Sequence, residues 1–124
     1  MIEWRQFCDG VRDVRMDGEG ILVALGSGRH HRLDVRPGTD AIELCGIVAR
    51  RSVAAGIEDV TLVAWQRNRG TSIVGFRLDD RGRLVGEAWV TGAGLTKDEF
   101  LFYARSLAAA CDLFEFQLTG RDRE

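Results

Sequence analysis

The stretch VGFRLDDRGRLVGEAWV, residues 74 to 90, decides the fold because it predicts two antiparallel strands joined by a tight turn. Asp80, Arg81 and Gly82 form a three-residue hairpin loop, since glycine readily adopts the positive φ that such a loop needs. This loop sets the register of the strands. The expected cross-strand pairs are Leu78 with Leu84, Phe76 with Gly86, Val74 with Ala88, Ile73 with Trp89, and Arg77 with Val85.

The two faces of this hairpin differ in chemistry. The face that carries Phe76, Leu78 and Leu84 is apolar and is predicted to meet the core. The opposite face is too apolar for free solvent and too charged for a core, so we expect another protein or peptide to cover it. Its residues are Ile73, Arg77, Val85, Glu87 and Trp89.

The clearest helix follows the hairpin. Thr96 and Glu99 have the spacing of a capping box, which predicts that the helix begins there. Its apolar stripe is predicted to pack on the side of the hairpin where small residues leave room. The stripe consists of Phe100, Ala104, Leu107, Ala108 and Cys111.

The remaining elements are predicted from periodicity. We expect a short helix over residues 2–9, then a meander of three strands over 21–25, 29–36 and 41–49. The segment 57–69 is ambiguous, since its β-branched residues favour a strand and its apolar spacing favours a helix; we expect a helix. The predicted class is α+β: one domain over 1–124, ordered helix, three antiparallel strands, helix, β-hairpin, helix.

Composition narrows the functional classes. A formal net charge of −2 on 124 residues argues against a nucleic-acid-binding protein and gives no reason to expect binding to an anionic membrane. The three cysteines are odd in number and lack a CxxC spacing, so we expect reduced thiols. MIEWRQFCDG does not resemble a signal peptide, and we expect a cytoplasmic protein without a membrane span.

Residues that could carry chemistry are few. His30 and His31 are neighbours on a predicted strand, so they point to opposite faces and are expected to be surface histidines rather than ligands of one metal. Cys45 and Cys111 are better interpreted as small core residues than as nucleophiles. We therefore expect no enzyme activity, no cofactor and no metal.

Arginine and tryptophan residues supply a second candidate surface. Trp65, Arg67 and Arg69 lie close together in sequence, and these residue types are favoured at interface hot spots, so we add them to the predicted partner-binding set. An alternative function remains open: a regulatory domain with a nucleic-acid or small-ligand site on Arg50, Arg51, Arg67 and Arg69.

Four motifs in the second half of the chain carry a resemblance: RNR at 67–69, VGFRLDDRGRLVGEAWV at 74–90, GLTKDEF at 94–100 and AAACDLFEFQLTGRD at 108–122. Together with the order of elements, they resemble the YbjN-like branch of proteins with the type III secretion chaperone-like fold. That resemblance implies a small, non-enzymatic, usually dimeric module whose sheet binds an extended protein segment or a second copy. The expected partners are therefore the chain itself and an unidentified protein or peptide.

Overall fold

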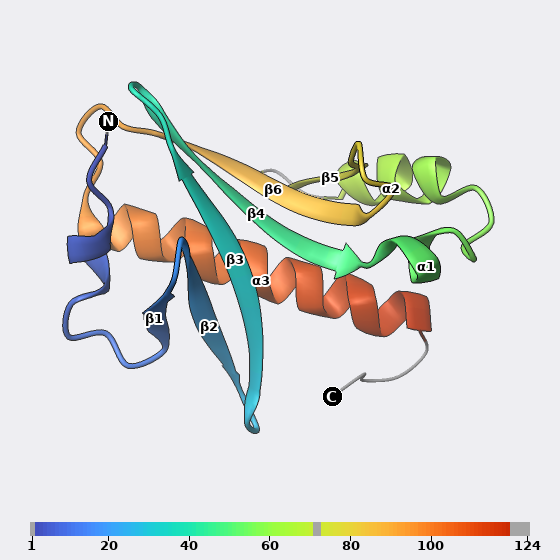
Figure 1. Ribbon diagram of the computed structural model, residues 1–124, viewed down its shortest axis with the longest axis horizontal. Helices are drawn as coiled ribbons and strands as arrows, with labels where there is room; N and C mark the ends of the chain where they lie inside the picture. Colours follow the sequence, from blue (N-terminus) through green and yellow to red (C-terminus); the bar gives the residue numbers. More distant parts are fainter. Residues whose placement is uncertain (1, 71–72, 120–124) are drawn as a thin grey trace.

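The computed structural model describes residues 2–70 and 73–119 and shows an α+β fold built on one antiparallel sheet (Figure 1). The sheet has six strands in the order β1-β2-β3-β4-β6-β5. The strands are β1 (Val14–Asp17), β2 (Gly20–Gly26), β3 (Arg29–Pro37), β4 (Ala41–Ala49), β5 (Gly75–Leu78) and β6 (Leu84–Thr91). The helices are the 3-10 helix η1 (Arg5–Cys8), α1 (Arg51–Ala54), α2 (Val60–Asn68) and α3 (Lys97–Thr119).

The predicted hairpin is confirmed in its loop and its register. Phe76 faces Gly86, Arg77 faces Val85, and Leu78 faces Leu84. The backbone N–H of Asp79 donates to the carbonyl of Arg83 over 2.8 Å and closes the three-residue loop, where Gly82 has a φ of +78°. The paired ladder is shorter than predicted, because it ends at Gly75 and Glu87 and so includes neither Val74 with Ala88 nor Ile73 with Trp89.

The N-terminal prediction is wrong in two respects. The helix expected over 2–9 is a single 3-10 turn, η1, and Gly10 follows it with a φ of +73°. Strand β1 was missed, so the meander has four strands rather than three. Asp17 pairs with Gly20 across a two-residue turn, and the φ of Gly18 is +63°. The apolar spacing that indicated a helix arises because η1 and β1 both point apolar residues into the core.

The ambiguous segment 57–69 is helical, as expected, and α2 begins at Val60. A short helix, α1, precedes it. Figure 1 shows α1 and α2 together at the end of the sheet far from the N-terminus, and α2 packs beside β5. The predicted strands over 21–25, 29–36 and 41–49 are confirmed as β2, β3 and β4.

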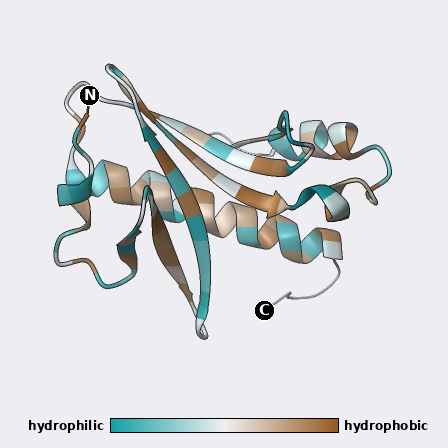
Figure 2. Ribbon diagram, viewed as in Figure 1, coloured by the Kyte–Doolittle hydropathy of each residue, from teal (hydrophilic) through white to brown (hydrophobic). Residues whose placement is uncertain are grey.

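Helix α3 covers one face of the sheet (Figure 1), and the core lies between this helix and the strands. Its capping box is confirmed: the N–H of Thr96 donates to Glu99 Oε1 over 3.0 Å, and the N–H of Glu99 donates to Thr96 Oγ1 over 3.2 Å. Every residue of the predicted apolar stripe is buried. In Figure 2 the hydrophobic colours fall mainly on β2, on the end of β4 and along α3, which are the elements that meet in this core.

Two glycines let α3 approach the sheet closely. Gly46 of β4 and Gly86 of β6 are direct cross-strand partners, and we call this pair the glycine notch. A Cβ atom on Gly86 would lie 2.7 Å from Cys111 Sγ, and one on Gly46 would lie 3.2 Å from the same atom. Only glycine therefore fits beneath Cys111 at both positions without movement of the helix or of neighbouring side chains.

The described residues contain no helix that is both long enough and apolar enough to cross a membrane.

Candidate functional site

The face of the sheet that turns away from α3, which we call the outer face, carries the hairpin residues predicted to bind a partner. Trp89 of β6 is the most exposed large apolar residue on it, with 64% of its surface accessible. Its direct cross-strand neighbour on β4 is Glu43, and Cys45 pairs with Glu87 in the next register position. An exposed tryptophan among acidic and basic side chains is typical of an interface anchor.

Charge pairs fix the side chains around this tryptophan. Arg77 Nε donates to Glu87 Oε1 over 3.0 Å, and Arg36 lies 3.9 Å from Glu43. Glu87 Oε2 is buried and has no hydrogen-bond partner among the described residues. Burial raises the pKa of Glu43, and the neighbouring Glu87 carboxyl raises it further. The outer face thus holds two crowded carboxyl groups whose arginine partners compensate them only in part.

The sheet edge beside Trp89 is incompletely covered. Strand β5 pairs with β6 only as far as Glu87, so among the described residues the last four of β6, 88–91, have no ladder partner on that side. A hollow of about 440 Å³ opens here and is lined by Ile73, Glu87, Trp89 and Tyr103, among others. Because Tyr103 belongs to α3, this hollow reaches around the edge of the sheet.

The other predicted partner-binding residues are divided between different environments. Val85 is fully buried, so it supports the outer face from below and cannot be contacted by a partner. Ile73 is half-buried, whereas Trp65 on α2 is 57% exposed. Two arginines are engaged within the chain: Arg67 of α2 lies over the Phe114 ring and bonds to Gln117, and Arg69, which follows α2, lies over Trp65.

The middle residue of the RNR motif has a role that the sequence analysis missed. The side-chain amide of Asn68 donates to the carbonyl of Phe76 over 2.9 Å and accepts from its N–H over 2.6 Å. It therefore occupies the hydrogen-bonding positions that a further strand would need next to Phe76 in β5. Asn68 therefore blocks addition of a partner strand at this point of β5. Among the described residues, β5 pairs with β6 only as far as Glu87 and does not reach residues 88–91.

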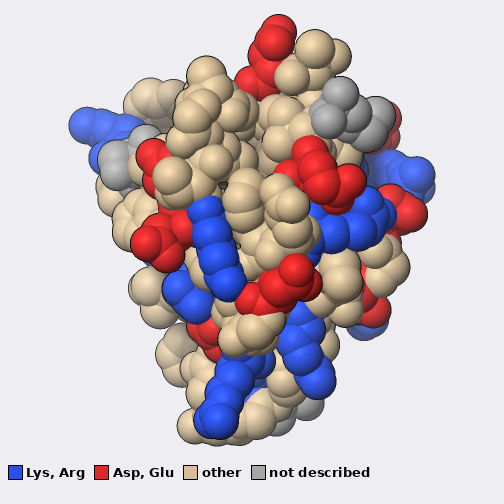
Figure 3. All heavy atoms as spheres, turned by 90° about the vertical axis from the view of Figure 1, so that its left-hand side faces the viewer, with Lys and Arg blue, Asp and Glu red and all other residues tan. Residues whose placement is uncertain are grey.

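Each of the four arginines of the alternative binding site makes a contact within the chain. Arg50 bonds to Ser52, and the side chain of Arg51 lies against Gly82. Arg67 and Arg69 stack on rings, as described above. Figure 3 faces the other end of the molecule, the left-hand side of Figure 1, where basic and acidic side chains alternate. This is in line with the ion pairs of Arg5 with Glu19, Arg32 with Asp17 and Arg105 with Asp13.

A second site lies where β3 and β4 separate. Their ladder ends at Leu33 and Gly46, and beyond this pair the two strands diverge (Figure 1). The opening is a hollow of about 580 Å³ whose lining includes His31 and Ile47 from the strands and Asp112 and Glu115 from α3. Sequence reasoning missed this site, although the one-turn spacing of the two acidic residues on α3 was a usable signal.

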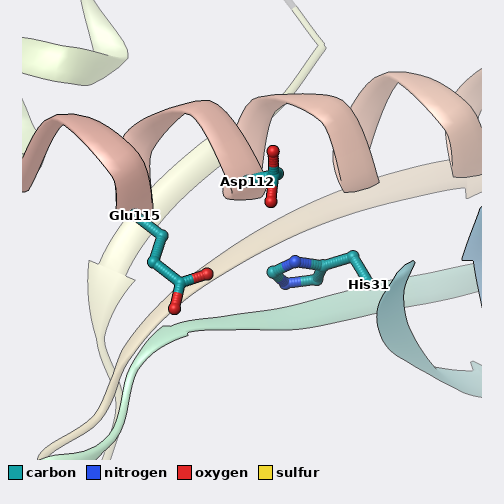
Figure 4. A group of neighbouring side chains, drawn as sticks. All are labelled: His31, Asp112 and Glu115. Atoms are coloured by element: carbon teal, nitrogen blue, oxygen red, sulfur yellow. The ribbon is translucent and has the colours of Figure 1, made fainter. Parts of the chain in front are cut away.

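His31 is buried, with 9% of its surface accessible, which corrects the expectation that both histidines lie at the surface. Its Nε2 donates to the carbonyl of Ile47 over 3.0 Å, and burial lowers the pKa of the ring. One ligand atom each from His31, Asp112 and Glu115 lies within 4.8 Å of the others (Figure 4). Arg29 forms an ion pair with Asp112 beside them. This group could hold a metal ion, in contrast to our expectation from the sequence.

The three cysteines are free and buried. Burial raises the pKa of Cys8, of Cys45 and of Cys111. A protonated thiol is a weak nucleophile, so the surroundings of these cysteines do not favour covalent catalysis.

Comparison with solved structures identifies the fold. The chain is similar to YbjN of E. coli, with a TM-score of 0.67 and 14% identity over 94% of this chain and 88% of that one. It is similar to the structure of the ExsC–ExsE complex, with a TM-score of 0.63 and 17% identity over 93% and 90% of the two chains. No family model and no curated protein matches the chain.

A third similar structure is the Yersinia pestis type III secretion chaperone SycH, solved with a fragment of YscM2. The TM-score is 0.55 and the identity 8%, over 90% of this chain and 95% of that one. The chain therefore has the type III secretion chaperone-like fold. YbjN shares this fold, as the resemblance of the motifs implied.

Proposed function

We propose that this chain is a non-enzymatic binding module that holds an extended segment of a partner protein beside Trp89. The observation that carries the proposal is the exposure of Trp89 next to the end of β6 that β5 leaves uncovered. We further propose that the unit is one domain over residues 1–124, acts as a homodimer and works in the cytoplasm.

The binding mode follows from the geometry of the edge. A segment aligned with residues 88–91 of β6 would gain main-chain hydrogen bonds, and its side chains would meet Trp89 and Ile73. Covering the exposed part of a tryptophan side chain removes roughly 150 Å² from water, which is worth about 3 to 4 kcal/mol before the cost of ordering the partner. The Arg77–Glu87 pair would set the register, since a displaced segment would face an unsuitable charge.

The comparisons support this proposal. Two of the similar structures were solved with a protein partner, ExsE in one case and a fragment of YscM2 in the other. SycH is a type III secretion chaperone. The buried, protonated thiols described above agree with a module that binds rather than transforms its partner.

Self-association tests the dimer and the role of Trp89 together. Light scattering across a dilution series should give a dimer for the unchanged chain, and Trp89→Ala should weaken association at least tenfold with a melting temperature within a few degrees. Trp65→Ala is the matched control, since this exposed tryptophan lies on α2, away from the β6 edge. A large loss of melting temperature in Trp89→Ala without a change in association would show that Trp89 is a packing residue.

Partner binding is tested separately by photo-crosslinking in cells. A photoreactive phenylalanine analogue at position 89 should give a discrete adduct with another protein, and the same analogue at exposed position 58 should not. Adducts that are equally abundant from both positions would refute a specific surface at Trp89.

A further inference from the structure

The side-chain cluster behind the separated strands has the composition of a metal site. His31 comes from β3, while Asp112 and Glu115 come from neighbouring turns of α3 and reach toward the imidazole ring (Figure 4). One ligand atom from each lies within 4.8 Å of the other two. Ligands around a bound ion of the zinc type are roughly 3 to 3.5 Å apart, so small side-chain rotations would bring the three atoms into coordination distance.

The orientation of His31 is an independent sign of ligand function. Its Nε2–H donates to the carbonyl of Ile47 over 3.0 Å, which fixes the ring and leaves the lone pair on Nδ1. Histidines that bind metals commonly donate their other ring N–H to a carbonyl or carboxylate in this way. The hydrogen bond that orients the ring therefore comes from the sheet itself, because Ile47 is the first residue of β4 beyond its ladder with β3.

The two acidic residues are also held by a rigid element. Asp112 and Glu115 are three positions apart on the long helix α3, so they lie on the same helix face. One imidazole and two carboxylates suit divalent first-row transition ions better than the larger calcium ion, which prefers six or more oxygen ligands. The hollow of about 580 Å³ in front of them leaves room for water at the remaining coordination positions.

We propose that His31, Asp112 and Glu115 bind one divalent transition-metal ion of the zinc class. The site connects β3 to α3 beyond the Leu33–Gly46 pair, where β3 and β4 are no longer paired. This inference is independent of the partner-binding proposal, because Trp89 and the hollow beside it share no residue with the lining of this site.

Arg29 provides a substitution that should change the metal affinity in the opposite direction from the ligand substitutions. Its guanidinium forms an ion pair with Asp112, so it places a positive charge beside the ion. A carboxylate has two oxygens and about four lone-pair positions, so Asp112 can hold Arg29 and a metal at the same time. The repulsion between Arg29 and the ion must nevertheless weaken binding. Removing this charge should therefore increase the affinity, whereas removing a ligand should reduce it.

The test is a titration of chelator-treated protein with Co²⁺, followed by visible absorption and calorimetry. The unchanged chain should bind one Co²⁺, and Zn²⁺ should displace it. Since the proposed ligands include no thiolate, the near-ultraviolet band of cobalt–sulfur coordination should be absent. Glu115→Gln and His31→Gln should each lower the affinity at least tenfold, and Arg29→Gln should raise it about tenfold.

Glu58→Gln is the matched control, because it removes the same charge from an exposed position on the loop before α2 and should leave the affinity unchanged. Circular dichroism and thermal melting of the metal-free variants show whether each one folds. Glu115 is partly exposed, so Glu115→Gln should fold and still tests the site if His31→Gln unfolds. The proposal is overturned if saturable binding is absent at millimolar Co²⁺, or if binding is unaffected by both ligand substitutions.

Discussion

The glycine notch beneath α3 allows a quantitative test of how the helix sits on the sheet. The change is Gly86→Ala. The new methyl would lie 2.7 Å from Cys111 Sγ and 2.9 Å from Cε1 of Phe76. Neither neighbour can move freely, because Cys111 is fully buried and the Phe76 ring packs edge-on against Phe114 with ring centroids 4.8 Å apart.

Inserting one methyl group into a filled core costs about 1 to 3 kcal/mol, and we expect Gly86→Ala to lower the free energy of unfolding by about 2 kcal/mol. Cys111→Ala removes the closest atom and by itself should cost about 1 kcal/mol, since it leaves a small void. In the double variant the methyl takes up part of that void. The combined loss should therefore be smaller than the sum of the two single losses by about 1 kcal/mol.

Urea denaturation at 25 °C measures all three variants. Gly75→Ala in the neighbouring strand is the matched control, since a Cβ there meets no atom within 4 Å. It should change the free energy of unfolding by less than about 1 kcal/mol, in either direction. Additive losses in the double variant, or an equal loss at Gly75 and Gly86, would refute the close approach of Cys111 to β6.

Three further changes test the site and its frame. Burial and Glu87 raise the pKa of Glu43, so ionisation of this carboxyl destabilises the fold, and stability is lost as the pH rises through the folded pKa. The stability of Glu43→Gln relative to the unchanged chain should therefore increase between about pH 4 and pH 7. Urea denaturation at both pH values measures this difference, and a constant difference would contradict the reasoning. Asn68→Ala should lower the free energy of unfolding by about 1 to 3 kcal/mol, because the N–H and carbonyl of Phe76 lose their hydrogen-bond partner. It should also increase aggregation, as measured by light scattering. Unchanged stability and solubility would show that the amide does not protect this edge. Thr96→Ala should lower the free energy of unfolding by about 1 kcal/mol through loss of the N-cap, which would appear as a lower melting temperature. Thr96→Ser keeps a hydroxyl group at this position and should retain most of the stability.

Local chemistry explains which parts of the fold could be predicted. The loop at Asp80–Gly82 fixes the hairpin register by its length alone, and the capping box fixes the start of α3 within one helical turn. The stripe on α3 follows from a period of 3.6 residues and needs no knowledge of what it meets. These signals lie within short segments, so the sequence contains all that is needed to interpret them.

The errors occur where a segment depends on distant neighbours. Strand β1 has four residues, of which only Val14 is buried, and it is a strand because β2 offers it a partner. Val85 lies on the outer face, as the alternation of side chains along β6 predicted. The alternation gives no information on whether neighbouring side chains cover a residue, and Val85 is completely buried.

The candidate metal site depends on an even longer separation. His31 and Glu115 are brought together by the crossing of α3 behind β3, and periodicity within either element gives no information about that crossing. The same limit applies to Asn68, whose amide acts as a substitute for a strand at Phe76. A side chain in that role has no local pattern from which it could be predicted.

The amide of Asn68 also limits how the protein can polymerise. A sheet with two open edges can add copies at both and grow into a fibre, whereas a sheet with one closed edge cannot. Because Asn68 occupies Phe76 at the β5 edge, continuous stacking of sheets through β5 is interrupted. Association through the opposite edge, at β1, joins two copies, and the open backbone that remains is the short end of β6 at residues 88–91, which the proposed partner segment would occupy. A single side chain thereby favours closed pairs over open-ended fibres.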